Sequence, residues 1–492
     1  MGLTNAMDIA SSSLATNAGL QAIVSRNVSN AQNTTGYVSA KVANVITGAN
    51  GAGIIESIAN LTNTSLFNTM LAGTASNAAA QALSDGVTLL QKTVADSTTT
   101  TDSTTAAQSP STLLQAMSSA LQTYSSSPSN TSAAAAVVTA ATNLANGLND
   151  ATTTTQNARE TADQDMVTSV ATITNLLKQF QGVNTTIVQG TASGSDITDA
   201  LDQRSTLLQS LSKEIGISTL TNSNGSMSIY TDSGVTLFET SPRTVTMTPQ
   251  TSYTASVAGN AVYVDGVPVT GSSAVMPIQS GALKGYADVR DSVAVTYQNQ
   301  LDSIAGGLIN AFAETGGLGP VAGLFRASAN TATIPTATVD AGLAGSIQVS
   351  AGADPSRGGS YTNIRDGSIN GVSQNSTPPA ASFNTLLRGY ISNLSSATTY
   401  PSGTALSTSS SLTSYASDSA SWLNSKYQGA SNDATYHTTL LSQTSQALSN
   451  ATGVNIDQQM SKMLEFENAY QASAKLISTI NAMFGSLLQA VA

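Results

Sequence analysis

The chain has 492 residues and a net charge of −11, and only 9% of its residues are charged and 5% aromatic, whereas about a quarter of an ordinary soluble domain is charged. Its 17 Lys and Arg residues are scattered singly, so the clustered basic surface that nucleic-acid binding requires is missing. With no Cys and one His, His437, the sequence argues against Cys/His zinc sites, iron–sulfur clusters and thiol nucleophiles. We therefore expect no catalytic residues, no metal, no cofactor and no nucleic-acid partner.

The sequence also lacks the features of membrane-spanning and targeting segments. The chain has no run of 18 apolar residues, and about 20 are needed to cross a bilayer. The first cation is Arg26, so the basic start of a cleavable signal peptide is lacking. We expect no membrane insertion and no cleaved signal. The length predicts two to four domains.

The first half of the chain has helical periodicity. Leu3, Met7 and Leu14 recur at helical spacing, which predicts an N-terminal axial helix and turn within residues 1–50. Residues 51–215 are expected to form the first part of a mainly helical domain. Within it, a weak helical pattern covers 54–95, a low-complexity linker covers 96–110, and helical spacing runs from Leu113 to Ile215.

The pattern then changes to short alternating runs. Asn224-Gly225 and Asp265-Gly266 separate such runs, and both pairs suit hairpin turns with positive φ. The predicted fold is therefore mainly α with β-rich insertions, in several domains. After the first helical part come a β-rich outer domain at 216–280, a helical return at 281–320, a β-hairpin or irregular segment at 321–380, the last helical part at 381–450 and a C-terminal axial helix at 451–492.

The C-terminal helix carries the strongest pattern. Steps of four and three alternate along it, and nine of the eleven positions are apolar: Ile456, Met460, Met463, Glu467, Tyr470, Ala474, Ile477, Asn481, Phe484, Leu488 and Val491. This spacing predicts a coiled-coil seam. A second apolar stripe lies beside it, comprising Phe466, Leu476, Ile480, Met483 and Leu487. A helix buried in the core of its own domain is the alternative interpretation, but the matching helix at the other terminus favours paired terminal helices with apolar surface left for neighbouring subunits.

Two segments at the chain ends resemble the axial proteins of the bacterial flagellum, which form its rod, hook and hook-associated parts. Asn27–Tyr37 is similar to the N-I-A-N-x-x-T-x-G-Y signature of that family, and Gly453–Val491, with AYQASAK at 469–475, resembles its closing helix. Where the family has a Pro, this chain has Thr35, and where it has an Arg soon after the Tyr, the first cation is Lys41. The segments most similar to the first of the hook-associated proteins are Leu201–Ile217, Ser280–Val293, Leu301–Phe312 and Leu343–Gly359.

The resemblance implies a structural subunit of the junction between hook and filament. It implies a homo-oligomeric ring, contacts with the hook protein and a second junction protein, and an export chaperone at the C-terminal helix. It also implies unfolded passage through the flagellar type III export apparatus and an extracellular location. The expected assembly interface comprises Leu3, Met7, Leu14, Asn27, Asn30, Gly36, Tyr37, Ile456, Met460, Met463, Tyr470, Ile477, Phe484 and Leu488.

Other functions stay open at this point. Another axial protein, such as a hook subunit or a flagellin, would share the terminal helices. A secreted Ser/Thr-rich adhesin would fit the composition without needing them. An enzyme would require an acid pair among the 28 Asp and Glu residues, and no spacing singles one out.

Overall fold

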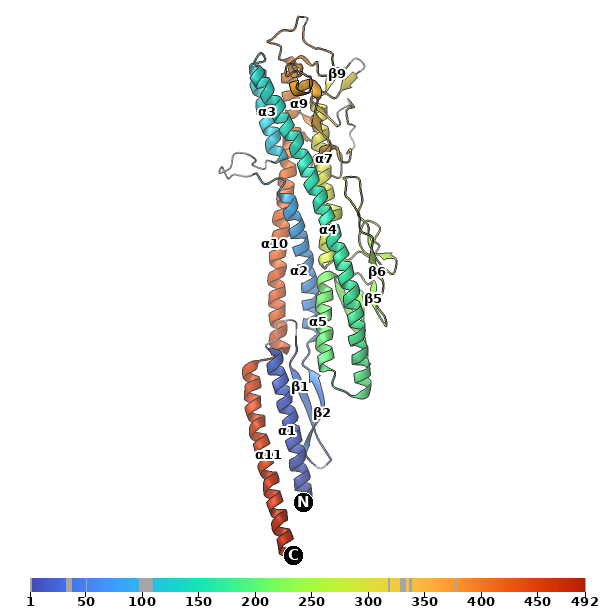
Figure 1. Ribbon diagram of the computed structural model, residues 1–492, viewed down its shortest axis with the longest axis vertical. Coiled ribbons are helices and arrows are strands. Elements are labelled where there is room, and N and C mark those ends of the chain that lie inside the picture. Colours follow the sequence, from blue (N-terminus) through green and yellow to red (C-terminus); the bar gives the residue numbers. More distant parts are fainter. Residues whose placement is uncertain are drawn as a thin grey trace.

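Figure 1 shows the computed structural model, an elongated molecule with both chain termini at the same end. It describes residues 2–31, 38–49, 51–96, 109–316, 319–327, 333–335, 339–376 and 378–491. The prediction of a mainly helical, multidomain fold with small β-sheets and paired terminal helices is confirmed. The molecule has two parts, an axial arm and a helical body. The axial arm comprises residues 2–61 and 453–491, and the helical body comprises the described residues between them.

The axial arm is built from two long helices and one hairpin. Helix α1 (Leu3–Ala31) lies beside α11 (Ile456–Val491), and the strands β1 (Lys41–Thr47) and β2 (Gly53–Asn60) pack on α1. The two strands are antiparallel, with a register shift between Asn44 and Val45. Figure 1 shows α1 between α11 and the hairpin. The arm is therefore a thin three-layer unit with little interior of its own.

The helical body is organised around long helices that run along the molecule (Figure 1). The 63-residue helix α4 is the longest, and α10 packs along α2. Its helices are α2 (Thr64–Gln91), α3 (Pro110–Ser126), α4 (Thr131–Ser193), α5 (Thr198–Glu214), α6 (Ala282–Asp288), α7 (Ala294–Ala311), α8 (Asn363–Asp366), α9 (Thr385–Ser395) and α10 (Leu412–Thr452), with a π-helical turn, Val289–Val293, between α6 and α7. The helical periodicity from Leu113 to Ile215 thus corresponds to three helices.

Six short strands lie within residues 216–280. They are β3 (Ile217–Thr221), β4 (Met227–Thr231), β5 (Thr236–Phe238), β6 (Val245–Met247), β7 (Val262–Val264) and β8 (Val267–Pro268), arranged as two three-stranded antiparallel sheets. Both predicted hairpin turns are present: Gly225 has φ +82°, and Asp265 and Gly266 have φ 47° and 81°. Two positive φ values in succession are those of a type I′ turn.

Three sequence-based predictions of secondary structure are wrong in detail. The helical pattern assigned from residue 54 begins only at Thr64, because residues 53–60 form β2, which pairs with β1 and packs on α1. The segment 381–450 contains a small hairpin, β13 (Ala397–Thr399) with β14 (Ser409–Ser411), whose small residues, one Ala with Ser and Thr, carry no apolar alternation. The helical return predicted at 281–320 ends at Ala311, because β9 (Glu314–Gly316) and β10 (Gly319–Val321) form a hairpin. The described part of 321–380 is mostly irregular, which is one of the two predicted alternatives, and within it β11 (Phe325–Arg326) pairs with the distant β12 (Gln348–Val349).

The linker predicted at 96–110 falls largely outside the described residues. Of that stretch the structure describes Asp96, Ser109 and Pro110. Ser109 caps α3 by accepting a hydrogen bond from the Thr112 amide, and Pro110 occupies its first turn, where the missing N–H costs nothing. Asp96 in turn accepts from the Ser109 amide at 2.6 Å. The hydrogen bonds of Ser109 therefore fix the C-terminal end of the linker at the first turn of α3.

The buried apolar side chains of the body form two large clusters. One joins α3, α4, α7, α9 and α10, and the other joins α4 and α5 to the β-sheets of 217–269. A buried ion pair, Arg290 to Asp163 at 2.7 Å, connects the π-helical turn to α4. Arg159 beside it donates to the carbonyls of Thr254 and Val257. These charged contacts fix the loop 254–260 of the β-rich segment to the helical spine.

Candidate assembly interface

The two long helices of the arm are antiparallel with a definite register. Ser13 Oγ lies 3.3 Å from Ser473 Oγ, and Asn27 Nδ2 donates to Gln459 Oε1 at 3.2 Å. Each step forward in α1 is therefore matched by an equal step back in α11. Because this register places the start of α1 near residue 484 of α11, the last turns of α11 extend beyond α1, as Figure 1 also shows. Leu487 and Leu488 are exposed there.

The face of α11 that packs on α1 lies between the two predicted stripes. Gln459, Ser473 and Ile480 are buried, and Met463, Phe466, Ile477 and Phe484 are half-buried. The predicted seam therefore coincides with the contact with α1 only at Met463, Ile477 and Phe484. Of its members, Ile456, Met460, Tyr470 and Leu488 are exposed. Small polar residues decide the register because Ser and Gln allow close approach and hydrogen bonds, which apolar spacing cannot reveal.

On the N-terminal side, Leu3, Met7, Leu14 and Asn30 are half-buried, and Asn27 is buried. The other two predicted interface residues, Gly36 and Tyr37, lie outside the described residues.

Two apolar flanks of α11 remain uncovered on either side of this contact. The first flank carries Ile456, Met460, Leu464, Tyr470 and Leu488, and the second carries Leu476, Met483 and Leu487. Leu464 is 60% exposed and Leu476 57%. Only five charged residues interrupt the helix, namely Asp457, Lys462, Glu465, Glu467 and Lys475. Exposed apolar surface of this extent marks an interaction site.

The hairpin adds further apolar surface on the other side of α1. Thr16 Oγ1 donates to the Gly53 carbonyl at 2.6 Å. A Cβ at Gly19 would lie 2.7 Å from Ile55 Cδ1, so the glycine allows β2 to lie against the helix. Val42, Ile46 and Ile54 stay exposed on the strands. The hairpin thus gives the arm an apolar surface that sequence reasoning missed.

A polar cluster joins the arm to the body. The Asn27 side chain accepts from the Lys41 amide and donates to the Lys41 carbonyl, both at 2.8 Å. The Lys41 ammonium is fully buried and lies 2.6 Å from Asp202 and 3.3 Å from Asp199. Sequence analysis singled out Asn27 but missed these partners. The available signal was the spacing of three Asp residues, 196, 199 and 202, on one face at the start of a helix.

A second ion pair lies at the edge of the same cluster. Arg26 bonds Asp196 at 2.8 Å and Asp199 at 2.9 Å. The hydrogen bond to Asp196 raises the pKa of Arg26. Burial acts to raise the pKa of Asp196, but hydrogen bonds from Thr198 and Arg26 outweigh it and leave that pKa below its ordinary value. Both groups are therefore held charged.

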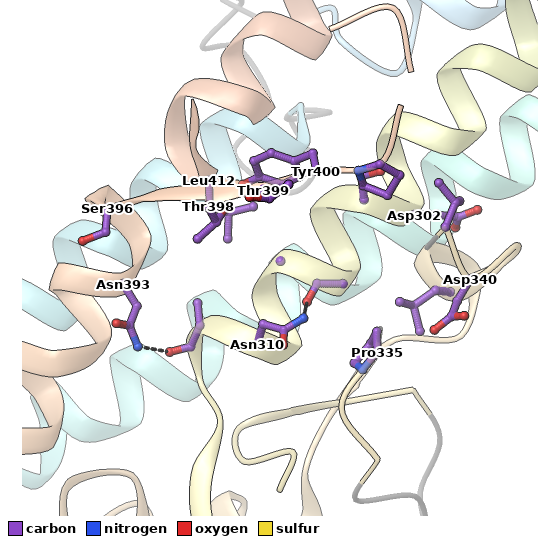
Figure 2. A pocket seen from close by; sticks show the side chains of 17 residues that line it. Asp302, Asn310, Pro335, Asp340, Asn393, Ser396, Thr398, Thr399, Tyr400 and Leu412 are labelled. Carbon is purple, nitrogen blue, oxygen red and sulfur yellow. Dashed lines mark hydrogen bonds between the residues drawn. The ribbon is translucent and has the colours of Figure 1, made fainter. Parts of the chain in front are cut away.

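The body contains a cavity of about 420 Å³ between α7, the end of α9 and the β13 strand, shown in Figure 2. Asp302 lies at its wall, and its oxygens accept from the backbone amides of Gly342 and Ala344. Burial raises the pKa of Asp302. The carboxylate holds a loop in place. Asp340, the other acid of the lining, lies on that same loop region.

The described residues include no cluster of His, Asp or Glu that could bind a metal ion. Within the same residues, every helix is too short or too polar to span a membrane.

Comparison with known families identifies the chain. Residues 98–320 match the helical domain of the flagellar hook-associated protein FlgK, and residues 445–490 match the C-terminal domain of the flagellar basal body rod proteins FlgE, FlgF and FlgG. The chain therefore carries a helical domain of the FlgK type and a C-terminal domain of the flagellar rod-protein type. It is therefore a structural component of the bacterial flagellum. The FlgK match covers much of the body, and the rod-protein match covers the end of α10 and nearly all of α11.

Among solved structures, the FlgK flagellar hook junction protein from Burkholderia pseudomallei is similar over 53% of this chain, with 20% identity and a TM-score of 0.42. The match spans 47%, about half, of the length of that structure. No curated protein gives a significant match.

Proposed function

We propose that this chain is a FlgK-family, non-catalytic structural subunit that joins the flagellar hook to the filament, and that it assembles through the axial arm. The observation that carries the proposal is the pair of uncovered apolar flanks on α11. A helix buried in the core of its own domain has no exposed apolar flanks, whereas a helix that packs against neighbouring copies requires them.

The size of the flanks supports an assembly of several copies. Eight large side chains are exposed on α11, and full burial of such a side chain contributes about 1.5–3 kcal/mol. Covering half of that surface would contribute roughly 6–12 kcal/mol per subunit. Because the flanks lie on opposite sides of the α1 contact, each copy can meet one neighbour on each side. A closed ring of copies uses such head-to-tail contacts.

The same flanks suit a chaperone before assembly. An exposed stripe that includes Met460, Tyr470 and Leu488 would associate nonspecifically in the cytoplasm. A groove that accepts an amphipathic helix would cover it. We propose that an export chaperone binds α11 and that the unfolded chain is then exported through the flagellar type III apparatus. The lack of Cys means that no disulfide cross-links the chain in transit. Its working location is then extracellular, between the hook protein and a second junction protein.

The proposal is tested by Met460→Glu and Leu476→Glu, one on each flank, in cells that carry no other copy of the protein. The matched control is Thr479→Glu, which adds the same charge at an exposed polar position of the same helix. We expect the flank variants to be exported but to leave bare hooks, with filament subunits shed into the medium. The control is expected to build filaments, and immunogold labelling of them should mark the junction.

Three results would contradict the proposal. Normal filaments in both flank variants would remove the assembly role from α11. Labelling along the whole hook or the whole filament would instead support a hook subunit or a flagellin. Activity in surface adhesion that survives removal of residues 453–492 would favour the adhesin interpretation.

A further inference from the structure

The junction between arm and body differs in chemistry from the core of the body. Within the described residues, the hydrophobic clusters of the body contain no residue of the arm. Hydrogen bonds and ion pairs cross the junction. A purely apolar contact tolerates sliding, whereas hydrogen bonds and ion pairs require defined geometry.

We propose that the ion pair between Lys41 and Asp202 is a positioning contact that sets the angle of the axial arm on the helical body. Asp202 lies on α5 in the body. One of its oxygens accepts from Lys41 Nζ at 2.6 Å, and the other accepts from Ser39 Oγ at 3.1 Å and Asn60 Nδ2 at 2.8 Å. A single carboxylate of the body therefore binds the start of β1 and the end of β2 together.

Lys41 extends this contact through the whole arm. Its backbone is paired with the Asn27 side chain of α1, and Asn27 also donates to Gln459 of α11. A continuous path of direct contacts thus runs from the body through the hairpin to both long helices, and Lys41 is the residue through which it passes. The neighbouring Ala40 amide donates to the Thr452 carbonyl at 2.8 Å, so the end of α10 is tied to the same point.

Because the ion pair between Lys41 and Asp202 is buried, it favours a single orientation of the arm. The Lys41 side chain is 0% exposed and that of Asp202 is 13% exposed. Other charges that face the pair are Asp199, which also bonds Lys41, and the more exposed Arg26 and Asp196. A buried ammonium must keep its carboxylate because water cannot replace it. The arm therefore has one orientation in which this lysine is paired.

The experiment measures the arm angle directly in the purified full chain. Because the chain has no Cys, Ala18→Cys on α1 and Thr185→Cys on α4 provide two unique spin-label sites, both exposed. Electron–electron double resonance then gives the distribution of distances between arm and body. We expect a narrow distribution in the parent chain and loss of that narrow distribution in Lys41→Met and in Asp202→Asn. Arg26→Gln, which removes the more exposed pair, should broaden it less.

A double variant separates positioning from stability. Lys41→Met combined with Asp202→Asn leaves no unpaired buried charge, so thermal stability should recover relative to either single variant. The distance distribution should stay broad, because no ion pair selects the angle. The control Arg243→Gln, which breaks an exposed pair in the β-rich segment, should change neither reading. Unchanged distributions in the single variants, or a narrow one in the double variant, would overturn the proposal. Since no assembly is involved, its failure is independent of the proposed junction function.

Discussion

Replacement of Ile480 by Asp should unfold the arm while leaving the body intact. Ile480 is 8% exposed and lies on the face of α11 that packs on α1. The substitution loses nearly the full burial of the side chain, about 1.5–3 kcal/mol, and adds the cost of a buried carboxylate without a partner, a further few kcal/mol. We expect a local destabilisation of about 4 kcal/mol or more.

The arm cannot absorb a loss of this size. Among its described residues, the other buried apolar side chains are Ala10, Ile23, Val24, Ala40 and Ala52, and hydrogen bonds and ion pairs connect the arm to the body. The pairing of α1 with α11 should therefore open. The two body clusters, which share no residue with it, should persist.

Hydrogen exchange of the purified monomer measures both parts at once. Amides of α1 and α11 should lose protection in Ile480→Asp, while those of α4 and α7 keep it. The matched control is Leu476→Asp, one turn earlier and 57% exposed, where the carboxylate meets water and exchange should change little. Equal protection of the arm in both variants would refute the packing register, and loss of protection throughout the body would refute the independence of the two parts.

Three further outcomes concern the body. Burial raises the pKa of Asp302, so between the two pKa values the folded state keeps a proton that the unfolded state releases. The contribution of Asp302 to the unfolding free energy should therefore fall as pH rises from about 4 through the raised pKa. Asp302→Asn should remove this pH dependence from unfolding free energies measured across that range. Asp163→Asn removes one of the two acid partners of the buried Arg290, which keeps Asp291, and should lower the unfolding free energy by about 1–3 kcal/mol, measured in urea. Gly285→Ala places a Cβ 2.3 Å from the Ala79 carbonyl oxygen, which should separate α6 from α2 and cost about 1–3 kcal/mol, visible as a lower melting temperature.

Several features of this protein follow from local sequence. The turns at Asn224-Gly225 and Asp265-Gly266 could be predicted because the residues that tolerate positive φ are few. The long helices from Leu113 to Ile215 could be predicted because a 3.6-residue apolar period leaves one face to bury. The family resemblance rested on short segments at the two chain ends and in the middle.

The tertiary structure alone decided how those elements meet. Apolar periodicity showed that α11 has wide apolar surface, but the choice of which face packs on α1 depended on Ser473 and Gln459, whose hydrogen-bond partners lie more than 400 residues away in the sequence. The strand at 53–60 could not be recognised because its alternation is weak, and its pairing with β1 and packing on α1 arise only in the folded chain. The pairing of Lys41 with Asp202 spans 161 residues. Local patterns determine which residues are helical or extended because those preferences act over a few residues, whereas register and buried ion pairs arise only when distant segments are brought together.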